Sequence, residues 1–205
     1  MSSWTEEKTL EIFARASLPT QFGDFQIIAF HNGDTRIEDV AIIRGNPRGK
    51  ESVPTRVHSE CVTGDVFHSL RCDCRQQLEL AQKHFAELPD AIILYMRQEG
   101  RGIGLANKVA AYQLQENGYD TVEANIHLGF DDDLRSYDTA AAMLKALGVI
   151  SIDLYTNNPR KIDGLRENGI TVVRRDPIII EPNGYNDLYL KTKQIKSGHL
   201  LDLEK

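Results

Sequence analysis

An uninterrupted apolar run, A-I-I-L-Y-M at residues 91–96, is the feature that most restricts the fold of this chain. Its length suits one β-strand and is too short for a buried helix. A strand without polar positions must be covered on both faces, as strands are in sheets flanked by helices. Pro89 and Asp90 precede the run and a glycine-rich segment follows it, so the strand is bounded on both sides. We therefore expect an α/β fold.

The rest of the chain carries strand and helix patterns that agree with this fold class. Strands are predicted at residues 25–30 and 40–45, around the turn signal Asn32-Gly33-Asp34, and at residues 53–58, 152–155, 172–173 and 177–180. Helices are predicted at residues 4–16, after Cys74, around residues 105–112, at 137–147, after Asn158 and at the C-terminus. We predict mixed β-sheets flanked by helices in one layered domain over residues 1–205.

The charge balance and the apolar pattern exclude several classes of protein. The formal net charge is -6, which argues against broad binding to nucleic acid, because such binding needs a basic face. No apolar run approaches the ~20 residues of a membrane span. The first residues are polar and lack the apolar region of a signal peptide. We therefore expect a cytoplasmic protein without a nucleic-acid or membrane partner, whose thiols stay reduced.

All 3 cysteines fall in one short segment, residues 61–74, with the spacing C-x10-C-x-C. Three thiolates make a soft site that suits Zn²⁺. A catalytic zinc keeps three protein ligands and an open position for water, whereas a structural zinc has four ligands. A closed site completed by His58, His68 or His84 is one alternative, and buried thiols without a metal are another. The odd number of cysteines argues against a disulfide.

Cations near predicted helix starts indicate that an anion binds. Arg97 and Arg101 lie in the strand-to-helix junction R-Q-E-G-R-G-I-G-L, where backbone N–H groups can bind a phosphate. Arg135 and Lys161 also lie near helix starts, where a cation is unfavourable unless an anion is close. The junction lacks the Walker A pattern. Helical periodicity alone favours a core position for Tyr112.

Together these motifs resemble the GTP cyclohydrolase II family. The resemblance rests on R-V-H-S-E-C-x-T-G-D, S-L-R-C-D-C, Y-x-R-Q-E-G-R-G-I-G-L, G-Y-D-T-V-E-A-N, L-G-F, T-N-N-P-R-K and G-H-L, which occur in this order between about residues 18 and 201. It implies hydrolysis of GTP with release of formate and pyrophosphate, giving 2,5-diamino-6-hydroxy-4-(5-phosphoribosylamino)pyrimidine, the first step of riboflavin biosynthesis. It also implies a homodimer, and a stand-alone form without a fused dihydroxybutanone phosphate synthase domain.

The resemblance further implies the residues of the site. Zn²⁺ would be held by Cys61, Cys72 and Cys74, and Mg²⁺ would accompany the triphosphate. The catalytic group would be Tyr112, Asp133 and Arg135. The contacts with GTP would come from Arg56, Val57, His58, Ser59, Glu60, Gln77, Glu99, Gly100, Arg101, Thr121, Thr156 and Lys161.

Two roles for Arg135 remain open. The family resemblance implies a nucleophile, with Asp133 as its proton acceptor. A guanidinium hardly ever loses its proton, so a clamp on the charge of the transition state is the alternative. Tyr112 would donate a hydrogen bond to developing negative charge or position a water molecule. Glu60 would either shuttle protons or recognise the purine.

Three other functions compete with the complete reaction. A related enzyme could stop at the formamide product, but the phenol of Tyr112 favours the complete reaction. A non-catalytic paralogue could bind GTP as a sensor, but the intact cysteines, Asp133 and Arg135 argue against it. A zinc-stapled nucleic-acid module is disfavoured by the acidic balance and the lack of a basic stripe.

Overall fold

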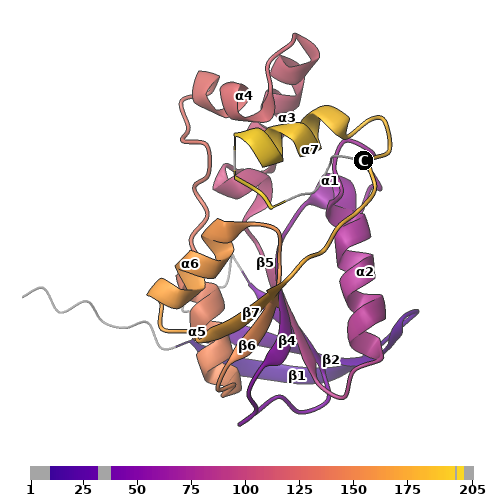
Figure 1. Cartoon of the computed structure of the whole chain (residues 1–205), viewed down its shortest axis with the longest axis vertical. Helices are drawn as coiled ribbons and strands as arrows, with labels where there is room; N and C mark the ends of the chain where they lie inside the picture. The colour runs from indigo at the N-terminus through magenta and orange to yellow at the C-terminus, as the bar shows by residue number, and fades with distance from the viewer. Residues whose placement is uncertain (1–9, 32–37, 197, 201–205) are drawn as a thin grey trace, which may run out of the picture.

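A seven-stranded mixed sheet crosses the computed structural model, which describes residues 10–31, 38–196 and 198–200 (Figure 1). The strand order is β1-β2-β3-β5-β4-β6-β7. Neighbours are antiparallel from β1 to β5 in this order and parallel from β5 to β7. The strands are β1 (Glu11–Thr20), β2 (Gly23–His31), β3 (Val40–Arg44), β4 (Val53–Ser59), β5 (Ala91–Met96), β6 (Ile152–Tyr155) and β7 (Val172–Asp176).

Helices cover both faces of this sheet, as the α/β prediction requires. α2 lies against one face, α5 and α6 lie against the other, and α3, α4 and α7 gather beyond one end of the strands (Figure 1). The predicted α/β class is therefore confirmed. The helices are α1 (Val62–Asp65), α2 (Cys74–Ala86), the 3₁₀ helix η1 (Glu99–Gly102), α3 (Gly104–Glu116), α4 (Thr121–His127), α5 (Asp138–Leu147), α6 (Pro159–Glu167) and α7 (Asp187–Ile195).

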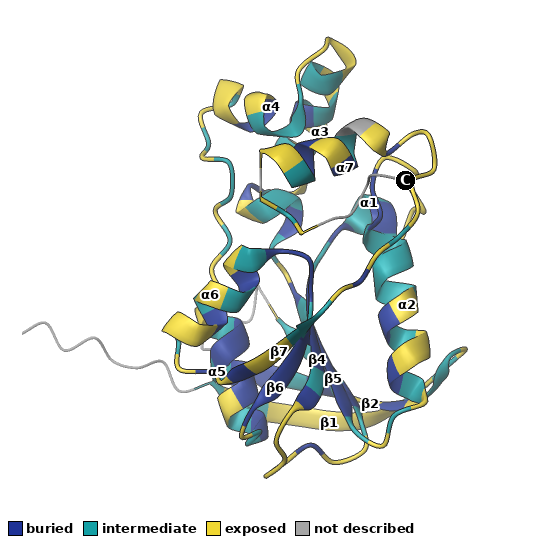
Figure 2. Ribbon diagram, viewed as in Figure 1, coloured by how far each residue is buried: buried dark blue, intermediate teal, exposed yellow. Residues whose placement is uncertain are grey.

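The apolar strand β5 supplies two cores at once. Ile92 and Leu94 are fully buried in the larger core, which includes Leu144 of α5. Ile93 between them is fully buried in the smaller core with Phe85 of α2. Burying each of these side chains contributes roughly 1.5–3 kcal/mol. Alternate residues of β5 thus hold helices on opposite faces of the sheet. The buried, dark blue centre of Figure 2 follows the central strands β4, β5 and β6.

Two predicted elements are wrong. Residues 11–16, predicted as part of a helix, belong to the edge strand β1, which pairs with β2 along its whole length and is largely exposed (Figure 2). Pairing with a neighbouring strand outweighs the local helix signal here. The capping residues Ser3 and Glu6 lie outside the described residues. Residues 177–180 form no strand, because Asn157 bonds the N–H and the carbonyl of Ile178 through its side chain.

Several other predictions are confirmed. β2 and β3 pair antiparallel, as expected for strands around a turn, although the turn signal itself lies outside the described residues. α6 begins at Pro159, and the side chain of Asn158 accepts a hydrogen bond from Arg160 N. α5 ends at Gly148, which adopts φ 74°. α4 was not predicted, although Asp120 and Glu123 form a reciprocal capping box there.

The parallel half of the sheet determines where a site can form. β5 lies on one side of β4 and β6 lies on the other. In such sheets ligands bind outside the carboxyl ends of the strands, where the strand order reverses. The segments that leave these ends begin at Glu60, Arg97 and Thr156. Those segments therefore carry the candidate site.

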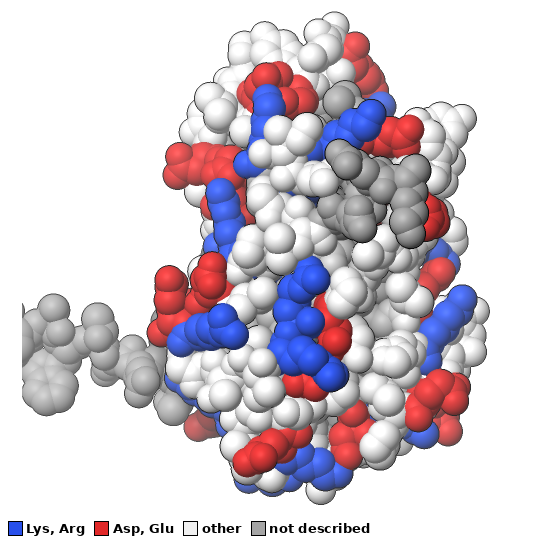
Figure 3. Space-filling view, in the orientation of Figure 1, with Lys and Arg blue, Asp and Glu red and all other residues white. Residues whose placement is uncertain are grey.

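Basic and acidic side chains are interspersed over most of the face drawn in Figure 3, with one group of basic side chains near its centre. Among the described residues, no helix is both long enough and apolar enough to cross a membrane.

Candidate active site

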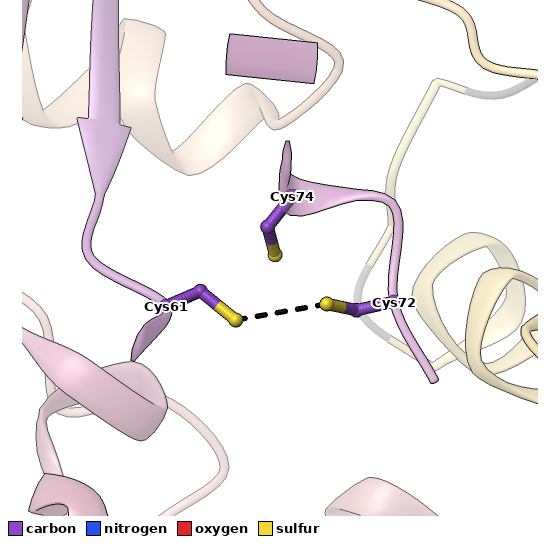
Figure 4. A group of neighbouring side chains, drawn as sticks. All are labelled: Cys61, Cys72 and Cys74. Carbon is purple, nitrogen blue, oxygen red and sulfur yellow. Dashed lines mark hydrogen bonds between the residues drawn. The ribbon is translucent and has the colours of Figure 1, made fainter. Parts of the chain in front are cut away.

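The three cysteines converge at the carboxyl end of β4 (Figure 4). Cys61 follows β4, whereas Cys72 and Cys74 lie around the start of α2. Their sulfur atoms all lie within 4.8 Å of one another, and the sulfurs of Cys61 and Cys72 are 3.6 Å apart. A disulfide bond is ~2.05 Å long, so these are free thiols. The predicted clustering of the three cysteines is confirmed.

This donor set fits a zinc ion. Three soft sulfur atoms from two segments face one point, as a metal with a fourth open position requires. Gly64 leaves room for the cysteine sulfur atoms. A Cβ at this position would lie only 2.9 Å from Cys72 Sγ and 3.1 Å from Cys61 Sγ. The tight approach of α1 to the cysteines therefore requires glycine at this position.

No histidine joins the cysteine group within the described residues. The histidines that the sequence offered as a fourth ligand contact other groups: His58 Nε2 lies 3.2 Å from Asp65 Oδ1, His68 contacts Arg75, and His84 Nε2 lies 3.1 Å from Tyr155 Oη. The geometry thus favours three cysteine ligands over a closed Cys3His site.

The cysteines form part of the wall of a pocket of about 1110 Å³, including its open mouth. Most residues expected from the family resemblance line it: Arg56, His58, Ser59, Glu60, Gln77, Glu99, Gly100, Arg101, Tyr112, Thr121, Arg135, Thr156 and Lys161.

Two expected residues lie behind the pocket wall instead. Val57 is fully buried in the core, and its carbonyl accepts a hydrogen bond of 2.6 Å from Lys161 Nζ. Asp133 lies behind Arg135 and lines a second, adjoining cavity. Both residues therefore contact groups that line the pocket.

Arg56 is a buried cation with a free donor. Its Nη2 donates to Gln77 Oε1 at 2.6 Å and its Nη1 to the carbonyl of Tyr155 at 3.3 Å. Its Nε is buried without a hydrogen-bond partner among the described residues. Burial lowers the pKa of Arg56 to about 10. The residue therefore remains charged at neutral pH and can bind a polar ligand.

His58 and Asp65 connect β4 to the cysteine segment. The His58 ring stacks on Tyr95 with centroids 5.5 Å apart. The Asp65 carboxylate accepts hydrogen bonds from Tyr95 Oη at 2.9 Å and from Cys61 N at 3.0 Å. Burial lowers the pKa of His58, so its ring is neutral near pH 7. By accepting a hydrogen bond from Cys61 N, the Asp65 carboxylate fixes the backbone of that cysteine.

Arg135 and Asp133 form a bidentate ion pair. Arg135 Nη2 lies 2.5 Å from Asp133 Oδ2, and Nε lies 2.8 Å from Oδ1. Burial opposes ionisation of both groups, but these hydrogen bonds hold the pKa of Asp133 below its ordinary value and raise the pKa of Arg135. Arg135 Nη1 is 3.4 Å from Ser59 Oγ on the pocket side. The pair is thus ionised, and one arm of the guanidinium faces the pocket.

Lys161 lies in the first turn of α6, as predicted, and is buried. Burial and the charges of Arg135 and Arg56 lower the pKa of Lys161 well below its ordinary value. Lys161, Arg56 and Arg135 thus disfavour one another's positive charge unless an anion lies between them. This part of the pocket, beside the end of β4, therefore has the character of an anion site.

Tyr112 lies in the pocket wall, and its prediction as a core residue is wrong. Leu105 and Val109, which share its helix face, are exposed, so this face of α3 does not pack on the sheet. Tyr112 Oη lies 3.1 Å from Thr63 Oγ1 of α1. Burial raises the pKa of Tyr112, so the phenol keeps its proton at neutral pH.

Several residues of the pocket wall were not predicted from the sequence. Lys108 of α3 lies against Cys61, with Nζ 3.1 Å from Sγ. Tyr189 and Lys193 of α7, together with His199, also line the pocket. Burial lowers the pKa of His199 to about 3, helped by the charge of Lys193. No local pattern predicts that α7 reaches a cysteine segment that lies far from it in the sequence.

Comparisons with known proteins agree on one family. The family described as GTP cyclohydrolase II matches residues 11–177. The chain is 48% identical to GTP cyclohydrolase-2 of Picrophilus torridus, over 93% of this chain and 99% of that protein. It is 52% identical to GTP cyclohydrolase-2 of Cronobacter sakazakii, over 94% and 98%. It is 51% identical to the riboflavin biosynthesis protein RibBA of Endomicrobium trichonymphae, but spans only 48% of that longer protein.

Proposed function

The chain belongs to the GTP cyclohydrolase II family, and on that premise we propose that it hydrolyses GTP, opening the guanine imidazole ring and releasing formate and pyrophosphate. The product would be 2,5-diamino-6-hydroxy-4-(5-phosphoribosylamino)pyrimidine, the first intermediate of riboflavin biosynthesis. One observation carries the proposal: three convergent thiols and several buried cations line the same pocket. A ligand with a ring to be hydrolysed and a polyanionic tail matches both parts.

The cysteine part of the pocket serves the ring-opening steps. A zinc ion held by Cys61, Cys72 and Cys74 would supply Lewis-acid chemistry that makes water a nucleophile near neutral pH. Tyr112 keeps its proton and is positioned by Thr63, so its phenol can donate a hydrogen bond to negative charge that develops on the opening ring. The chain thus provides an acid group next to the soft donor site.

The cationic part of the pocket serves the triphosphate. Lys161, Arg56 and Arg101 offer charge to the phosphate oxygens, and Mg²⁺ would enter with the triphosphate as its counter-ion. Arg135 acts as a charge clamp rather than as a nucleophile. The pairing with Asp133 supports this role, because it raises the pKa of Arg135 and lowers that of Asp133, which makes proton transfer between them unfavourable.

The remaining expectations stay proposals that rest on the family. We propose that residues 1–205 act as one catalytic domain, that two copies form a homodimer, and that the protein works in the cytoplasm. A related enzyme that stops at the formamide is the second candidate. The protonated phenol of Tyr112 in the pocket wall favours the complete reaction.

One assay separates these functions. The protein is incubated with GTP and Mg²⁺, and formate, pyrophosphate and the pyrimidine are measured together. Complete reaction gives all three in equal amounts. Pyrophosphate with a formamide but no formate would establish the shorter reaction, and binding without any product would establish a sensor.

A matched variant tests the division of the pocket. We expect Cys72→Ser to reduce formate release far more than pyrophosphate release, because the two reactions occur at different atoms of GTP. Phosphorus NMR follows the second product directly. Equal loss of both would contradict separate roles for the two parts of the pocket.

A further inference from the structure

Lys108 places an ammonium group against a sulfur atom of the cysteine cluster. Its Nζ lies 3.1 Å from Cys61 Sγ and 2.6 Å from Glu99 Oε1. The side chains of Lys108 and Glu99 are only 12% and 7% exposed. A charge pair that is so shielded from water interacts strongly with the groups around it. Neither the sequence patterns nor the family resemblance assigned a role to Lys108.

Glu99 holds this ammonium in place through hydrogen bonds to three donors. Its Oε1 accepts from Lys108 and, at 2.8 Å, from Gly100 N. Its Oε2 accepts from Val62 N at 2.6 Å, and Val62 directly follows Cys61. One carboxylate therefore fixes both the lysine and the backbone beside the cysteine that the lysine contacts.

The local backbone is shaped for this approach. Gly100 adopts φ 63°, a left-handed conformation that favours glycine. A Cβ at Gly100 would lie 3.1 Å from Lys108 Cβ. The glycine thus allows η1 to pass close to α3 while Glu99 reaches Lys108.

The charge of a three-thiolate site explains why a cation is useful there. Three thiolates around a divalent ion leave a net charge of about −1 in a low-dielectric wall. A hydrogen bond from an ammonium to one sulfur stabilises that thiolate and reduces the electron density it donates to a metal. A bound metal then remains a stronger Lewis acid.

We propose that Lys108 is a positioning residue of the metal centre, which donates a hydrogen bond to the Cys61 thiolate and is itself held by Glu99. This inference rests on the proposed function, because it takes the cysteines as metal ligands. Glu99, which the family resemblance places among the GTP contacts, then also acts on the metal centre through Lys108.

Cobalt absorption spectroscopy tests this role without GTP. Co²⁺ bound by thiolates gives a sulfur-to-metal charge-transfer band in the near ultraviolet, whose energy falls as the sulfur becomes a stronger donor. We expect Lys108→Met to move this band to longer wavelength and to weaken Co²⁺ binding by roughly 10–100-fold, the usual cost of losing an outer-shell partner. Lys108→Arg, which keeps the charge, should restore most of both properties.

Two further variants complete the design. Gln113→Met, at an exposed position of the same helix, is the matched control and should leave the band unchanged. If Lys108→Met does not fold, Lys108→Gln provides the same test, because it keeps a donor for Glu99 but removes the charge.

Each result has a distinct meaning. A band that is identical in the parent protein, the neutral Lys108 variant and Gln113→Met would overturn the inference, even if activity fell. A band shift in the neutral variant that Lys108→Arg reverses supports it. No thiolate-to-cobalt band in the parent protein would instead refute the metal centre itself, and with it the proposed function.

Discussion

Removing the ammonium of Lys193 is expected to destabilise the cysteine segment from the far end of the chain. Lys193 lies on α7, and its Nζ is 2.7 Å from Oδ1 of Asp73, the residue between Cys72 and Cys74. The two side chains are 10% and 2% exposed. Lys193→Met keeps most of the side-chain volume but leaves the Asp73 carboxylate buried without its cation.

The structure sets the size of the effect. Breaking a buried ion pair by removing one partner costs about 3–5 kcal/mol. Asp73 keeps the hydrogen bond from Gln77 Nε2 at 2.5 Å, so we expect the lower end, about 3 kcal/mol. With a urea slope of roughly 2–3 kcal/mol/M, the unfolding midpoint should fall by about 1–1.5 M.

Urea unfolding followed by circular dichroism measures this shift. Lys191→Met is the matched control, because Lys191 is exposed on the same helix, and it should stay within about 0.5 kcal/mol of the parent protein. The double variant Asp73→Asn with Lys193→Met should lose clearly less than the sum of the two single variants. Additive losses, or a Lys193→Met midpoint equal to that of Lys191→Met, would refute the buried pair.

Three further predictions concern the triphosphate. Arg101→Ala should raise the KM for GTP steeply and leave the zinc content unchanged, whereas a normal KM would assign the phosphates to other residues. Arg135→Ala should reduce pyrophosphate release by about 10³–10⁵-fold, as loss of an arginine clamp does, and a GMP adduct on Arg135 that forms and decays during turnover would contradict the clamp. Because burial and neighbouring cations lower the pKa of Lys161, binding of the polyanion should draw a proton onto it. GTP affinity should then fall as pH rises through that lowered pKa. Calorimetry in buffers of different ionisation enthalpy should show proton uptake, and proton release would count against this role.

The features that could be predicted from the sequence are those with short-range patterns. The run at β5 requires two covered faces whatever its neighbours are, and Asn158-Pro159 starts α6 by local hydrogen bonding. The cysteines share a short segment, so their convergence needs only one strand end and one helix start. These features depend on residues that lie near one another in the chain.

The features that were missed depend on distant partners. β1 has no strong strand pattern of its own and becomes a strand because β2 offers its edge. Residues 177–180 look like a strand, but the side chain of Asn157 takes the hydrogen bonds of Ile178. Lys193 looks like a surface lysine of an ordinary helix, until α7 brings it against Asp73. Tyr112 follows a core pattern, but its helix extends beyond the sheet.

A crystal structure with a non-hydrolysable GTP analogue, with anomalous data at the zinc edge, tests the central claim most directly. That claim is that one pocket holds the guanine at the cysteines and the phosphates at the buried cations. We predict a zinc peak among Cys61, Cys72 and Cys74 without a fourth protein ligand, the guanine facing it, and the phosphates at Lys161 and Arg135. A histidine bound to the zinc in every state, or the phosphates at the cysteines, would contradict the account.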